Sequence, residues 1–138
     1  MQRTIAVVLF AVAATAAPNV IANEKPTPEF QNLMKSNGMT VAALRMHIMA
    51  KEYDGIAMDA ATLRSNFAKI EAFWTARKVD DAVAFAKTGA KGAADLETAA
   101  KARSDEEIGA ANKVTTSACG GCHMAHREQL PDKTFEIK

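Results

Sequence analysis

Apolar residues recur at steps of three and four through residues 23–138, which is the period of amphipathic α-helices. Four helical segments are predicted: one from about Thr27 to Ala50, one after a turn at residues 53–55, one over about 79–102, and one that begins at Ser104. Four such helices joined by short connections pack most simply as an antiparallel up-down-up-down bundle. The pattern therefore predicts an all-α fold.

The helix ends and the core follow from local signals. Ser104 with Glu107 three residues later predicts a capping box, and Pro131 is expected to stop the last helix and leave a polar tail. Met46, Met49 and Met58 are expected to pack. The residues expected on the apolar sides of the four helices are Phe30, Leu33, Met34, Val41, Leu44, Ile48, Leu63, Phe67, Ile70, Trp74, Val83, Ala86, Ala90, Leu96, Ile108, Ala111, Thr115, Ala118, Cys119 and Cys122.

The first 22 residues have the pattern of a secretory signal peptide. Arg3 precedes an uncharged apolar run over residues 5–17, and Ala22 ends a short small-residue cleavage pattern. The run is shorter than the roughly 20 residues that span a bilayer, so an uncleaved membrane anchor is the weaker alternative. We expect cleavage after Ala22, export to the periplasm, and a mature domain over residues 23–138 that is free of the membrane.

Charge narrows the classes of partner. The whole chain has a formal net charge of +1, and loss of Arg3 with the signal peptide brings it to zero. Basic and acidic residues are interspersed, without the basic patch of a nucleic-acid binder. The sequence also has no long basic helix face of the kind that would predict adsorption to a membrane.

The two cysteines carry the clearest chemical signal. Cys119 and Cys122 are followed directly by His123, which completes C-x-x-C-H, the haem-attachment pattern. Cysteines at i and i+3 share a helix face, so both thiols can reach the two vinyl groups of one porphyrin edge. We therefore expect one covalently bound haem c, with His123 as an iron ligand. A disulfide, a thioredoxin-like redox pair and a small metal site are the alternatives; the redox pair would require strands that the pattern lacks.

This motif, near the end of an alanine-rich four-helix chain, resembles class II cytochromes c, the cytochrome c′ family, most closely the low-spin cytochrome c-556 branch. The family motif ends C-x-x-C-H-x-x-[aromatic]-R; here Arg127 is kept and His126 stands in place of the aromatic residue. The resemblance extends over residues 23–138 and implies that Met34 is the second iron ligand. Phe30 replaces a family arginine, which removes an expected contact to a haem propionate.

Position and the resemblance together favour Met34 as the second ligand. In an antiparallel bundle the start of the first helix lies beside the end of the fourth, so Met34 can face the haem; core packing is the alternative. Met39, about 140° around the helix, is the fallback ligand. His47 lies about 20 Å further along and is expected at the surface. His126 is expected in the haem surround or in solvent, and Arg127 in the haem surround or as an ordinary surface residue.

Two filled axial positions would close the iron to ligands. With His123 and Met34 both bound, the expected function is one-electron transfer with a redox partner protein of unknown identity. The alternative is a five-coordinate haem that binds NO or CO, with Met34 as a distal blocker. An enzyme such as a peroxidase is not expected, because no distal histidine or arginine stands near Met34 in the first helix. The resemblance also implies a possible homodimer.

Overall fold

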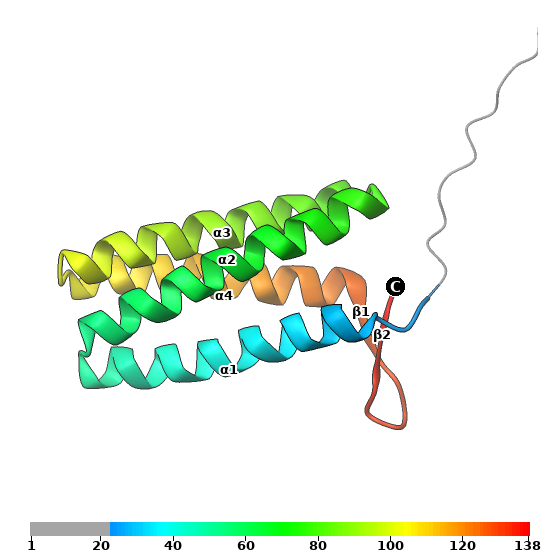
Figure 1. The fold of residues 1–138 in the computed structure, drawn as a ribbon, viewed down its shortest axis with the longest axis horizontal. Helices are drawn as coiled ribbons and strands as arrows, with labels where there is room; N and C mark the ends of the chain where they lie inside the picture. The colour runs from blue at the N-terminus through cyan, green and yellow to red at the C-terminus, as the bar shows by residue number, and fades with distance from the viewer. Residues whose placement is uncertain (1–22) are drawn as a thin grey trace, which may run out of the picture.

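The computed structural model describes residues 23–138; the expected signal peptide, residues 1–22, lies outside the described residues. Four long helices make up most of this part: α1 (Pro28–Ala50), α2 (Tyr53–Arg77), α3 (Asp80–Lys101) and α4 (Asp105–His126). Consecutive helices run back and forth beside one another (Figure 1). The structure thus confirms the expected four-helix bundle. None of the helices within residues 23–138 is long and apolar enough to cross a membrane.

Side-chain caps begin two of the helices. The Thr27 hydroxyl accepts a hydrogen bond from the Phe30 N–H (3.3 Å), and the Ser104 hydroxyl accepts one from the Glu107 N–H (3.4 Å). Each contact satisfies an N–H group that has no partner within its own helix. The predicted start of the fourth helix at Ser104 is confirmed.

The expected turn at residues 53–55 is wrong, because these residues form the first turn of α2. The connection is shorter: Lys51 adopts a left-handed conformation with φ 56°, and its N–H bonds back to the carbonyl of Ile48. Asp54 reads as a turn residue in the sequence, but it suits a helix start equally well, because a carboxylate is favourable near the positive N-terminal end.

The expected polar tail is also wrong. Residues after α4 form an antiparallel hairpin of β1 (Arg127–Gln129) and β2 (Phe135–Ile137), and α4 itself ends at His126, before Pro131. Glu24 pairs with Ile137 through two backbone hydrogen bonds of 3.0 and 2.8 Å. The buried Ile137 side chain joins the core. The segment before α1 and the segment after α4 are therefore joined at one end of the bundle, where Figure 1 shows the hairpin.

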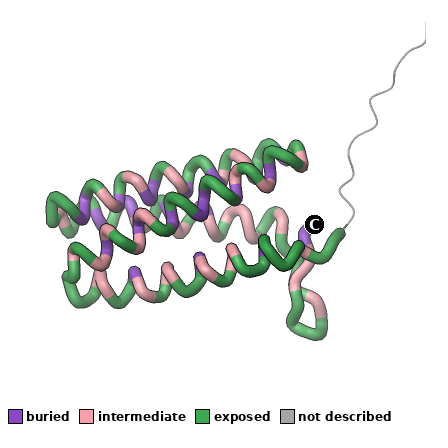
Figure 2. The backbone as a smooth tube through the Cα atoms, viewed as in Figure 1, coloured by how far each residue is buried: buried purple, intermediate pink, exposed green. Residues whose placement is uncertain are grey.

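The helices do not pack equally. The α2–α3 and α3–α4 pairs pack most closely, whereas α1 rests mainly on α2. Small residues on α3 allow the close approach: a Cβ added at Gly92 would come within 2.7 Å of the Thr115 hydroxyl, and one added at Gly89 within 2.3 Å of the Phe67 ring. Buried positions follow the inner faces of the helices (Figure 2), and α1 contributes only three of them.

Two glycines in helices provide a matched test of this packing. Gly92→Ala should lower the free energy of unfolding by about 1–3 kcal/mol, because the added methyl group overpacks the α3–α4 contact. Gly109→Ala, on α4 in open space, should raise it by about 0.5–1 kcal/mol through helix propensity. Urea unfolding followed by circular dichroism measures both. Equal effects of the two substitutions would contradict the close approach.

Candidate functional site at one end of the bundle

The last turns of α4 carry the C-x-x-C-H residues. Cys119 and Cys122 lie one turn apart, on the helix face that the buried Thr115 also occupies. Both side chains are half-buried and pack against the core cluster, and both thiols are free. The arrangement presents two sulfur atoms on one inward face of one helix.

The surroundings of the two thiols disfavour thiolate formation. Burial raises the pKa of Cys119, and burial together with the charges of Cys119 and Asp81 raises the pKa of Cys122 to about 11. A redox-active dithiol needs the opposite environment, one that lowers the pKa of its attacking thiol. The site therefore holds neutral thiols and gives no support to the redox-pair alternative.

His123 is half-buried beside the cysteines. Burial, and then the positive charge of Arg127, lower the pKa of His123, so its imidazole is neutral at pH 7, the form that binds metals. Arg127 Nη1 lies 3.4 Å from His123 Nδ1, and because arginine only donates, Nδ1 accepts and the proton of the neutral imidazole is on Nε2. The Arg127 guanidinium also lies 3.4 Å above the Phe135 ring. The hairpin thus holds Arg127 next to His123.

Met34 lies on the inward half of α1. It is about 60° around the helix from Asn37, which accepts a hydrogen bond from the Asn66 amide of α2 at 2.8 Å. It is about 40° from Phe30, whose ring stacks on Phe73 of α2. Met34 is half-buried and packs against the core.

His123 lies in the last turn of α4. The α3-facing side of α4 is marked by Gly121, where an added Cβ would come within 2.5 Å of the Phe85 ring. His123 follows Gly121 by two residues and lies about 60° around the helix from His126, which contacts Trp74 and Asp81. The half-buried Met34 and His123 both belong to the end of the bundle where α1 begins and α4 ends (Figure 1).

An aromatic cluster lies beside these residues. Phe30 and Phe73 stack with centroids 3.8 Å apart, and Trp74 meets both rings edge-on. The His126 ring packs 5.1 Å from that of Trp74, while His126 Nε2 lies 2.8 Å from an Asp81 carboxylate oxygen. His126 is thus half-buried against the core and does not face solvent freely. The sequence analysis missed Phe73 and Asp81, because they belong to α2 and α3 and carry no motif.

The remaining candidates lie elsewhere. Met39 is 66% exposed on the outer side of α1, which removes it as a fallback ligand. The expectation that three other methionines pack is wrong, since they also point outward: Met46, Met49 and Met58. His47 lies at the far end, as expected, but is half-buried rather than fully exposed, with Nδ1 2.7 Å from an Asp59 oxygen.

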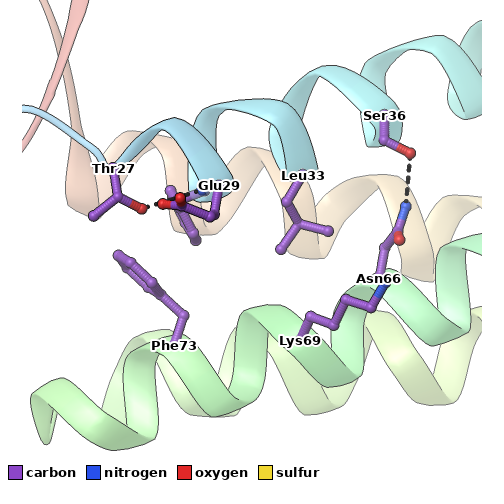
Figure 3. Close-up of a pocket in the computed structure, with 8 residues that line it drawn as sticks. Thr27, Glu29, Leu33, Ser36, Asn66, Lys69 and Phe73 are labelled. Carbon is purple, nitrogen blue, oxygen red and sulfur yellow. Dashed lines mark hydrogen bonds between the residues drawn. The ribbon is translucent and has the colours of Figure 1, made fainter.

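Two surface grooves are separate from the cysteine–histidine site. A groove of about 400 Å³ lies between α1 and α2, and Figure 3 shows the side chains that line it. Its lining residues are Thr27, Glu29, Phe30, Leu33, Ser36, Asn66, Lys69 and Phe73. A second groove of about 380 Å³ lies between α3 and α4. Neither is lined by a cysteine or a histidine. Within residues 23–138, no group of three or more His, Cys, Asp or Glu side chains is placed to hold a bare metal ion.

Comparison with models of known protein families and with curated proteins finds no match to this chain. The resemblance to class II cytochromes c therefore remains a prediction from the motif residues.

The raised thiol pKa values predict slow alkylation of the haem-free protein. At pH 8, iodoacetamide should label Cys122 in the folded, haem-free wild-type protein roughly a hundredfold more slowly than in urea, because the reactive thiolate is scarce when the pKa is near 11. The rate should rise about tenfold for each pH unit up to that value. Mass spectrometry of quenched samples measures it. Labelling as fast as in urea would revive the redox-pair alternative.

Proposed function

We propose that this chain is a periplasmic electron-transfer protein of the class II cytochrome c type. One haem c is held by thioether bonds from Cys119 and Cys122, and its iron is bound by His123 and Met34. The observation that carries the proposal is the C-x-x-C-H motif at the inner end of α4, with two neutral thiols on the core-facing side and a neutral imidazole directly after them.

The donor set of this site fits a covalently bound haem. Each thioether forms when an S–H group adds across a vinyl double bond, a step that needs the thiols unoxidised and on one face. Free thiols one turn apart meet both needs. Once attached, the haem supplies a one-electron change between Fe(III) and Fe(II).

His123 and Arg127 would set the electronic character of the iron ligand. Binding of iron through His123 Nε2 would require the imidazole proton on Nδ1, so the hydrogen bond from Arg127 would be given up and only its charge would act nearby. A positive charge close to the ligand disfavours the more positive Fe(III) state, so Arg127 should favour the reduced form. Arg127 acts here through its charge and does not itself bind the iron.

Met34 decides between electron transfer and ligand binding. A half-buried thioether near the start of α1 supports Met34 as the second axial ligand, and methionine ligation would raise the reduction potential. One observation favours the alternative of a five-coordinate haem that binds NO or CO: α1 is the least tightly packed helix, so Met34 could move away from the iron.

Absorption spectra of the protein, matured in a periplasm that attaches haem, test the whole proposal. The oxidised protein should be low-spin with a weak far-red sulfur-to-iron band, and the reduced spectrum should not change with CO. A high-spin spectrum that shifts with CO would favour the gas-binding alternative. Haem that is absent, or that is extracted by acidic acetone, would contradict covalent attachment.

Substitution of single methionines tests the ligand assignment. Met34→Ala should abolish the far-red band, produce a CO-sensitive spectrum and lower the midpoint potential, because the iron loses its thioether ligand. Met39→Ala, on the exposed side of the same helix, should leave all three unchanged. Loss of the far-red band in the Met39 variant alone would show that the wrong methionine has been assigned.

A further inference from the structure

Trp74 holds an unusual polar atom. Its side chain is 2% exposed, and within residues 23–138 its Nε1 is the only fully buried side-chain nitrogen or oxygen without a hydrogen-bond partner. A buried donor without an acceptor is costly, and tryptophan N–H groups in protein interiors usually find one. The side chains packed against the indole are largely aromatic: Phe30, Phe73 and His126.

The place of Trp74 relates this donor to the proposed haem. Trp74 contacts Phe30, which lies one turn before Met34 on α1. It also contacts His126, which lies one turn after Cys122 on α4. The indole therefore contacts one residue that is a turn away from a proposed iron ligand and one that is a turn away from a proposed attachment residue. All of them lie at the same end of the bundle.

The chemistry of the haem periphery selects one acceptor. A haem c held by thioethers from Cys119 and Cys122 would carry its two carboxylates on the edge opposite the thioethers, and those carboxylates would need donors from helices other than α4. These carboxylates are the only strong hydrogen-bond acceptors of the macrocycle. Arg77, one turn after Trp74, is already engaged: it bonds the Glu24 carboxylate at 3.0 Å and stacks on Phe73.

We propose that Trp74 is a haem-positioning residue whose indole N–H donates a hydrogen bond to a haem carboxylate. This inference rests on the proposed function, because it requires a bound haem. The donor orients the carboxylate edge and offsets part of its negative charge within the core. Less negative charge near the iron favours Fe(II), so the contact should also raise the reduction potential.

The chain contains a single tryptophan, so the N–H group can be observed directly. Ultraviolet resonance Raman spectra of the intact haem-loaded protein contain an indole band that is sensitive to N–H hydrogen bonding. We expect a strongly hydrogen-bonded band in the loaded protein and a free N–H band in the haem-free Cys119→Ala/Cys122→Ala variant. A free N–H band in the loaded protein would overturn the proposal.

Trp74→Phe removes the donor and keeps an aromatic ring. In the loaded protein this change should shift the carboxylate bending band in the visible resonance Raman spectrum and lower the midpoint potential. Phe73→Leu, which disturbs the same aromatic cluster but leaves the N–H group, is the matched control and should move neither. Equal shifts in both variants would show a packing effect and overturn the proposal.

The two proposals fail in different ways. If the wild-type chain carries no covalent haem, its visible spectrum shows this before any variant is made, and the proposed function itself fails. If the haem is present but the indole band is that of a free N–H, only the role of Trp74 fails. Should the Trp74→Phe variant not fold, the band of the wild-type protein still decides.

Discussion

The close packing of α3 against both of its neighbours is the constraint on which the rest of the structure depends. Glycines remove the side chains that would hold these helices apart: Gly89 admits the Phe67 ring of α2, and Gly92 admits Thr115 of α4. Three helices thus form a compact unit, and α1 attaches to it mainly through α2. The asymmetry leaves α1 and α4 without close packing against each other, and the half-buried Met34 and His123 belong to these two helices.

The lightly packed α1 is held firmly at its two ends. At one end Glu24 pairs with Ile137 of the hairpin; at the other Lys51 and Tyr53 both bond the Asp105 carboxylate, at 2.5 and 3.0 Å, across to the start of α4. Between these ties α1 contributes only three buried residues. A helix fixed at its ends but not along its length can move to admit a large flat group beside α4 while the packing of α2, α3 and α4 stays intact.

Local signals in the sequence were enough to predict the helices, but not the hairpin or the pairing of Glu24 with Ile137. The three- and four-residue apolar steps and the cap at Ser104 act within one helix, so they are visible in the sequence. The hairpin depends on three-residue strands and on Glu24, more than a hundred residues from Ile137, and neither gives a periodic signal. The methionines misled for a different reason: hydrophobicity alone does not say whether Met46 lies on the inner or the outer side of α1.

Only part of the candidate site could be predicted from the sequence. Cys119, Cys122 and His123 lie within five positions of one another, so the motif reveals their chemistry, whereas the residues around them come from other elements. Arg127 is held by Phe135 of the hairpin, and His126 contacts Trp74 of α2 and Asp81 of α3. Phe30 illustrates the gain from the structure. As a single substitution it only removes a charge, but in the fold it packs against Trp74, whose N–H is the buried donor still in need of an acceptor. If the proposed haem is bound, the Trp74 N–H beside Phe30 would offer its carboxylate a partner where the resemblance predicts an arginine, with less charge buried in the core.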